Sequence, residues 1–177
     1  LQNRLDSLLV TDGDGTGGTT PSQGGKQPAR QCFPADTLVW IDGELIPISN
    51  VVPGQIVKKS LSNSSTISLQ KEVYSHEIEN VIEHNESEGS WERYEVILEN
   101  GNCITVADIH FFLLDSGLWI PVQDLTSNSK LVSLEGPVCV ERVVKRVLPN
   151  IGKVYNLKVK NAERYLVGKD GIVVRDW

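Results

Sequence analysis

The sequence predicts an all-β domain of many short strands and hairpins, preceded by a flexible segment. From residue 32 onward, short β-prone runs recur at close spacing, and almost no run has a helical period. Tight-turn dipeptides separate several of these runs, namely Asp42-Gly43, Asn100-Gly101 and Asp170-Gly171. Such pairs favour two-residue hairpin loops, because Asn, Asp and Gly tolerate the positive φ that these turns require.

Each expected strand is a run rich in β-branched and aromatic residues. The strongest hairpin signal joins residues 93–99 to residues 102–106 across Asn100-Gly101. Residues 71–83 are ambiguous between strands and a short helix. The expected strands span residues 37–41, 45–48, 55–59, 93–99, 102–106, 118–122, 130–134, 138–148, 153–159, 164–168 and 171–174.

The two ends of the chain differ in composition. Residues 1–31 are rich in Gly, Thr, Ser, Pro and Gln, and too few of them are apolar to offset the entropy of ordering. We expect this segment to be a flexible linker at the end of an upstream protein, and residues 32–177 to form the domain. Asp12 and Asp14 fit the first positions of a calcium loop, but Gln23 stands where that loop needs a bidentate Glu.

Composition excludes several classes of function. The 177 residues carry a net charge of −6, which disfavours nucleic acid as a partner. No apolar run approaches the roughly 18 residues of a membrane span. The three cysteines contain no CxxC pair, and none of the three histidines has a metal-ligand spacing with cysteine, so no cofactor, metal or disulfide framework is expected.

The chain contains no Met, which indicates a fragment of a larger precursor. Its compartment stays open, with a secreted or cell-surface location as one option. We expect a monomer.

Four stretches, in order, carry a resemblance to a known family. They are CFPADTLV (32–39), ISNVVPGQIV (48–57), residues 101–125 with their WIPVQDL run, and VYNLKV through GIVV (154–174). Together they resemble the Hint superfamily, the β-fold of self-cleaving inteins and hedgehog C-terminal domains. The resemblance covers residues 32–177 and implies that the chain acts once, in cis, on its own backbone.

The resemblance assigns the chemistry to Cys32 and His110. Cys32 would attack the Gln31 carbonyl and convert the Gln31–Cys32 amide to a thioester, an N–S acyl shift. His110 would be the acid that protonates the leaving nitrogen, close to the ordinary imidazole pKa of about 6.5. The plain alternatives are a buried Cys32 that packs as a small apolar residue, and a His110 that is an ordinary core histidine among apolar neighbours.

This sequence departs from the family pattern just before the histidine. Ala107 stands three residues before His110, where the family has Thr or Ser. Thr105 and Asp108 are second-rank candidates to supply the missing polar group, although Thr105 could equally be an ordinary strand residue.

The second departure is at the end of the chain, which reads Arg175-Asp176-Trp177 in place of His-Asn followed by a nucleophile. Asp176 could cleave the far end slowly through a succinimide. Trp177 cannot accept an acyl group, so efficient splicing should fail.

The expected function is therefore autoprocessing that releases the upstream polypeptide or transfers it to water, a thiol or an amine. Two alternatives remain: a catalytically silent interaction module with the same fold, and an atypical splicing intein. We expect Cys103 and Cys139 to be core thiols, although Cys139 could accept the acyl group in a branched step. Trp119 should pack in the core, and His76 and His84 should be solvated.

Overall fold

The computed structural model describes residues 31–58, 75–85, 92–146 and 152–176. In these residues fourteen strands form one continuous, curled antiparallel sheet, so the predicted all-β class is confirmed. The 3₁₀ turns η1 (Ile48–Asn50) and η3 (Val122–Asp124) are short. The predicted linker up to residue 30 and the calcium-loop motif lie outside the described residues. No helix in the described part of the chain is long and apolar enough to cross a membrane.

The strand order across the sheet is β10-β11-β6-β7-β1-β12-β5-β4-β2-β13-β14-β8-β9, with β3 paired to β2. The strands are β1 (Gln31–Pro34), β2 (Leu38–Ile41), β3 (Glu44–Pro47), β4 (Ile56–Val57), β5 (His76–Asn85), β6 (Arg93–Leu98), β7 (Cys103–Asp108), β8 (Phe111–Leu113), β9 (Trp119–Pro121), β10 (Lys130–Leu131), β11 (Val138–Arg146), β12 (Lys153–Val159), β13 (Arg164–Val167) and β14 (Ile172–Arg175).

Every expected strand corresponds to an observed one, and three features were missed or left open. The ambiguous segment forms the long strand β5, which pairs with β12 from Lys153↔Asn85 to Val159↔Ile78. Strands β1 and β8 were not predicted, because each is only three or four residues long and carries no turn dipeptide at its ends. The turn at Asp42-Gly43 has the positive φ values, 54° and 86°, that its sequence predicts.

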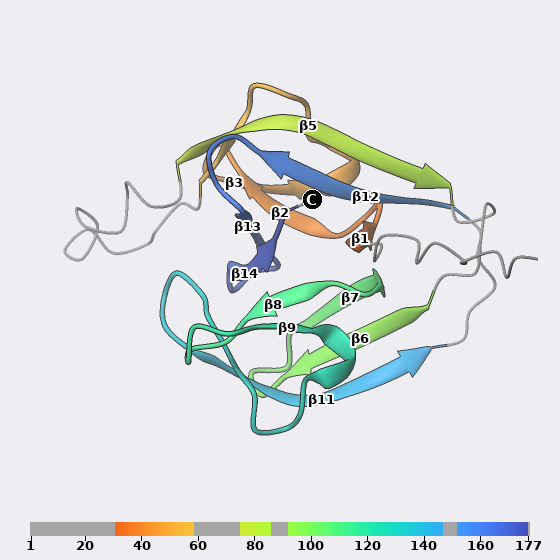
Figure 1. Cartoon of the computed structure of the whole chain (residues 1–177), viewed down its shortest axis with the longest axis vertical. Coiled ribbons are helices and arrows are strands. Elements are labelled where there is room, and N and C mark those ends of the chain that lie inside the picture. The colour runs from red at the N-terminus through yellow and green to blue at the C-terminus, as the bar shows by residue number, and fades with distance from the viewer. Residues whose placement is uncertain (1–30, 59–74, 86–91, 147–151, 177) are drawn as a thin grey trace, which may run out of the picture.

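The sheet folds into two lobes, and β1 connects them (Figure 1). One lobe contains β2, β5 and β12, and the other contains β6, β7 and β11. The first half of β1 pairs with β7, through Gln31↔Asp108 and Cys32↔Ala107. Its second half pairs with β12, through Phe33↔Tyr155 and Pro34↔Val154. Cys32 therefore lies where the chain passes from one lobe to the other.

The core runs through both lobes and encloses this crossing point. Phe33 and Tyr165 are among the largest fully buried side chains, and Trp119 packs against the same cluster, as predicted. Cys32, Ala107 and Val154 form a separate small buried cluster beside it. Cys32, Phe33 and Pro34 are all buried, so polar groups that reach this part of β1 are shielded from water.

Candidate active site

The Gln31–Cys32 peptide bond lies in strand β1, held against β7. Cys32 is 0% exposed, and the residue opposite it in β7 is Ala107, which is equally buried. Asp108 is the residue opposite Gln31. The methyl group of Ala107 can donate no hydrogen bond. The position at which the family has a hydroxyl is thus placed beside the predicted nucleophile, and here it is apolar.

His110 follows β7 and contacts both the first strand, β1, and the last strand, β14. Its ring lies 4.2 Å, centroid to centroid, from the ring of Phe33, the neighbour of Cys32 in β1. Its Nε2 lies 3.0 Å from the carbonyl oxygen of Arg175, the last residue of β14. One imidazole therefore connects the strand that begins the domain with the strand that ends it.

The contact with Arg175 fixes the state of the imidazole. A carbonyl oxygen can only accept, so Nε2 carries the hydrogen and Nδ1 carries a lone pair in the neutral ring. Nδ1 is buried and has no hydrogen-bond partner among the residues that the structure describes. A buried, unprotonated nitrogen beside β1 is able to accept a proton.

Burial lowers the pKa of His110 to about 3, and the hydrogen bond with the Arg175 carbonyl opposes this shift only in part. The expectation that His110 works near its ordinary pKa is therefore wrong. The cause is desolvation, because a fully enclosed imidazolium loses its hydration and gains no counter-ion in exchange. The residues that fold around His110 could not be identified from the local sequence.

This shift predicts acid lability. The pKa of His110 in the folded state lies below its ordinary value, so as the pH drops the unfolded state takes up a proton first. The free energy of unfolding therefore falls between about pH 6.5 and pH 3. Between pH 7 and pH 4 we expect His110 to cost about 3 kcal/mol of unfolding free energy. Urea titrations across this range should show the loss, and His110→Gln should remove most of it.

The matched control is His76→Gln, since His76 lies partly exposed on β5. That variant should keep the pH dependence of the wild type. Equal slopes for the His110 and His76 variants would contradict the assignment.

The carboxylate of Asp176 is anchored to β12. Its Oδ2 accepts hydrogen bonds from the Val159 N–H at 3.0 Å and from Lys158 Nζ at 3.2 Å. The residue is only 4% exposed, and burial raises the pKa of the carboxyl despite these two donors. Asp176 therefore has a structural role that the sequence did not indicate, as a link between the end of β14 and the neighbouring strand.

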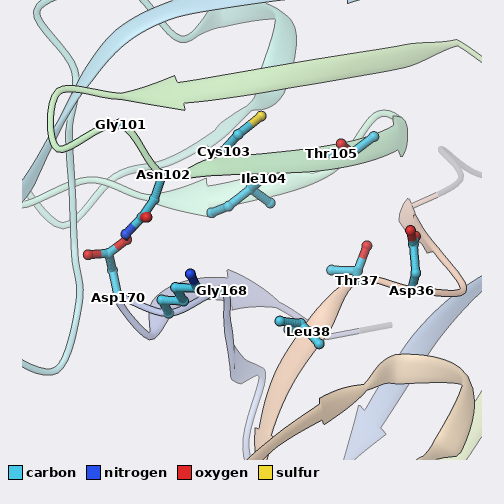
Figure 2. A pocket seen from close by; sticks show the side chains of 11 residues that line it. Asp36, Thr37, Leu38, Gly101, Asn102, Cys103, Ile104, Thr105, Gly168 and Asp170 are labelled. Atoms are coloured by element: carbon cyan, nitrogen blue, oxygen red, sulfur yellow. The ribbon is translucent and has the colours of Figure 1, made fainter.

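Thr105 is not directly opposite the Gln31–Cys32 bond, because β1 pairs with Ala107 and Asp108. It is two residues from Ala107 along β7 and lines a groove of about 350 Å³ with Asp36 and Thr37 (Figure 2). At the other end of the groove, the Asp170 carboxylate accepts hydrogen bonds from Asn100 and Asn102. Because side chains alternate along a strand, Thr105 is on the same face of β7 as Ala107, one position further along that face.

Two predictions about the other cysteines are corrected. Cys103 is exposed on the groove wall rather than in the core, because its side of β7 faces the groove. Cys139, partly buried in β11, is separated from β1 by two intervening strands, β6 and β7. At about 4.8 Å per strand this separation is about 14 Å, too far for direct acyl transfer from Cys32.

The predicted solvation of two histidines is met only in part. His76 and His84 are only partly exposed, because β5 packs along β12 instead of forming a polar loop.

One buried polar pair was missed entirely. Asn156 in β12 is 0% exposed, and its Oδ1 accepts hydrogen bonds from the Tyr165 hydroxyl at 2.7 Å and from the Leu157 N–H at 2.8 Å. Its Nδ2 is buried and has no partner within the described residues. An asparagine and a tyrosine inside strand-like runs give no sequence signal, since only the fold brings them together.

The fold is that of inteins. A bacterial intein-like domain from Clostridium thermocellum matches with a TM-score of 0.63 at 19% identity, over 84% of this chain and 100% of that one. The gp41-1 intein matches with a TM-score of 0.62 at 14% identity, over 84% and 100%. A DnaB intein from Synechocystis sp. PCC 6803 matches with a TM-score of 0.59 at 13% identity, over 84% and 99%.

The chain therefore has the Hint fold that inteins and intein-like domains share, as the sequence resemblance predicts. No family model matches the sequence, and no curated protein matches it either. Among the residues that the structure describes, no group of three or more His, Cys, Asp or Glu side chains could hold a metal ion.

Proposed function

We propose that this domain cleaves its own backbone once, at the Gln31–Cys32 bond, through a thioester. The observation that carries the proposal is the buried His110, whose ring lies against Phe33, whose Nε2 is bonded to Arg175, and whose Nδ1 keeps a lone pair. The Hint fold supports the same interpretation, because proteins of that fold in the comparison are inteins or an intein-like domain.

In the proposed reaction Nδ1 of His110 first accepts the proton of the Cys32 thiol. The sulfur attacks the Gln31 carbonyl carbon, and the carbonyl π electrons move to oxygen to form a tetrahedral intermediate. The imidazolium then donates its Nδ1 proton to the Cys32 nitrogen, the C–N bond breaks, and the oxygen regains its double bond. An amide and a thiol have become a thioester and an amine.

A neutral histidine suits this sequence of transfers. With a pKa of about 3, the ring is unprotonated at neutral pH, so the Nδ1 lone pair is available, but the ring is a weak base and proton transfer from the thiol is uphill. The protonated ring that forms afterwards is a strong acid, which favours rapid transfer to the leaving nitrogen. His110 thus acts first as a base and then as the acid that the resemblance implies.

The acceptor is proposed to come from outside the chain. Trp177 offers no nucleophile, and Cys139 is too distant in the sheet. Water, a small thiol or an amine would take the upstream polypeptide from the thioester, and efficient splicing is not expected.

The test is thiol-induced release. Residues 1–177 are expressed behind a folded reporter, and intact masses are followed with and without dithiothreitol. The expected product is the reporter joined to residues 1–31 as a dithiothreitol thioester or its hydrolysis product. Mass is preferable to alkylation as the readout, because Cys103 is exposed and would react before the buried Cys32.

A second candidate function is a silent interaction module with the Hint fold. Ala107 favours it, since this residue lies opposite Cys32 and has no hydroxyl. An intact precursor at every pH and thiol concentration would support that function and contradict autoprocessing.

Cleavage at the far end is proposed to be slow, because the Asp176 carboxylate is held by Val159 and Lys158. Succinimide formation needs a protonated carboxyl to leave β12 and meet the next backbone nitrogen. Lys158→Met removes a cation, so it should raise the pKa of Asp176 and accelerate loss of a downstream reporter by about tenfold for each unit of that rise. Mass spectrometry of the Asp176–Trp177 cleavage product measures this.

Lys153→Met is the matched control, because Lys153 pairs with Glu83 on an exposed surface. It should leave the rate of far-end cleavage unchanged. Rapid far-end cleavage in the wild type, as fast as thiol-induced release, would contradict the proposed anchoring.

A further inference from the structure

We infer that Asn156 donates the hydrogen bond that stabilises the Gln31 oxyanion during cleavage, and that Tyr165 positions the Asn156 amide for this role. The inference rests on the proposed function and adds a donor to it. It is carried by three observations: the direction of the Gln31 carbonyl, the fixed orientation of the Asn156 amide, and the buried Nδ2 that is left over.

The backbone alternation of β7 sets the direction of the Gln31 carbonyl. The Leu98 N–H donates to the Asn102 carbonyl at 2.9 Å, and the β6–β7 register continues from that pair without a shift to Arg93↔Ala107. In an antiparallel strand every second residue bonds its N–H and C=O to one neighbouring strand, and the residues between them turn theirs to the opposite side. Asn102 bonds to β6, and Ala107 is five residues further along, so Ala107 turns its N–H and C=O away from β6 and toward β1.

Cys32, opposite Ala107, therefore turns its own N–H and C=O toward β7. The carbonyl of the preceding residue, Gln31, points the other way, toward the side on which β12 lies.

Asn156 is the residue of β12 that the β1–β12 register sets opposite Cys32. The register of β1 with β12 runs through Pro34↔Val154 and Phe33↔Tyr155, so the next position in the series sets Cys32 against Asn156. Here β1 leaves β12, and the Leu157 N–H donates to Asn156 Oδ1. The amide thus occupies the edge that β1 has left, facing the Gln31–Cys32 bond.

The two contacts of Asn156 Oδ1 distinguish the oxygen of the side-chain amide from its nitrogen. A backbone N–H can only donate, so the atom that it meets must be the oxygen. The Tyr165 hydroxyl donates to the same oxygen. Nδ2 is therefore the atom that remains, with its hydrogens in a buried site and no partner there.

A buried donor without a partner costs free energy in the folded state. Its presence there is explained if another state along the reaction uses it. The oxyanion of the tetrahedral intermediate is such an acceptor. A donor already in place stabilises the developing charge without reorganisation. Ala107, opposite Cys32, cannot supply this hydrogen bond, whereas Asn156 has a buried NH₂ group available to donate it.

Tyr165 is a positioning residue in this arrangement. It is 1% exposed, and burial raises the pKa of its hydroxyl well above the ordinary range, with negative charge at Cys32 and at Asp176 adding to the shift. The hydroxyl therefore stays protonated and keeps donating to Asn156.

The test is the rate of thiol-induced release in two variants. Asn156→Asp keeps the acceptor for Tyr165 and Leu157 but replaces the NH₂ donor with oxygen. At pH 9, where the carboxyl is ionised, release should be about 10²- to 10³-fold slower than wild type. The deficit relative to wild type should shrink as pH falls, because a protonated carboxyl regains a donor. A purely structural role would not produce this pH-dependent ratio.

Tyr165→Phe removes only the hydroxyl and should slow release by about tenfold, with its melting temperature serving as a check on folding. Two controls match these changes. Asn80→Asp alters an exposed asparagine whose Oδ1 accepts from its own following N–H, at Val81. Tyr94→Phe removes a hydroxyl that donates to Glu92. Both controls should cleave at the wild-type rate.

The outcomes separate the two proposals. Wild-type release with an Asn156→Asp variant equally fast at pH 9 would overturn the assigned donor and leave the cleavage function standing. A variant that is slow by a factor that does not change with pH would overturn the donor in the same way. Absence of release from the wild type at any pH would overturn both.

Discussion

Replacing Cys32 with alanine is expected to abolish thiol-induced release altogether. The variant has no sulfur to attack the Gln31 carbonyl, and water held in a buried, apolar site cannot substitute for it. The volume change is small and the site is closely packed against Ala107 and Val154, so a moderate loss of stability accompanies the loss of reaction. The measurement is the intact mass of the precursor after prolonged incubation with dithiothreitol.

The other cysteines provide matched controls for this result. Cys103→Ala removes an exposed thiol on the groove wall, and Cys139→Ala removes a thiol two intervening strands away from β1. Both variants should release the reporter at the wild-type rate. Release from the Cys32 variant, or loss of release in either control, would assign the nucleophile elsewhere.

The second large effect is expected at His110. His110→Gln cannot accept and return a proton, so release should slow by about 10²- to 10⁴-fold, the usual contribution of general acid–base catalysis. The remaining rate would come from the proximity of the sulfur and the carbonyl within one dipeptide. Quench-flow or hand-mixed time courses, read by intact mass, cover this range.

The pH profile adds a qualitative test of the same residue. Because burial lowers the pKa of His110 to about 3, its base form is complete throughout the range from pH 5 to pH 9. The rate of thioester formation should therefore show no step near 6.5, the value for an exposed imidazole. A step at that pH which disappears in His110→Gln would show that the ring is hydrated in the reacting state.

The fold could be predicted because its signals are local. Alternating β-prone runs and turn dipeptides such as Asp42-Gly43 specify strands without knowledge of their neighbours. Strand β1 escaped prediction for the opposite reason: it is short, contains Pro34, and is held by β7 and β12, which are distant in sequence.

The sequence could predict two residues that the fold brings close together, but it could not predict their electrostatic surroundings. Sequence resemblance selected Cys32 and His110, and the fold brings both to the same region, around Phe33. The depressed pKa, the bond to the Arg175 carbonyl and the Asn156–Tyr165 pair all depend on tertiary burial. A backbone carbonyl has no sequence signature, so its part in fixing the imidazole tautomer could be seen only in the structure.

The link from β1 through His110 to the end of β14 has a mechanical consequence. Gln31 and Asp176 adjoin elements that meet around one imidazole, so a host polypeptide could receive the domain in a surface loop without its flanks being forced apart. Tension applied across those flanks would load the pairing of Gln31 and Cys32 with β7 at one end, and the bonds from Asp176 to Val159, Lys158 and Glu163 at the other.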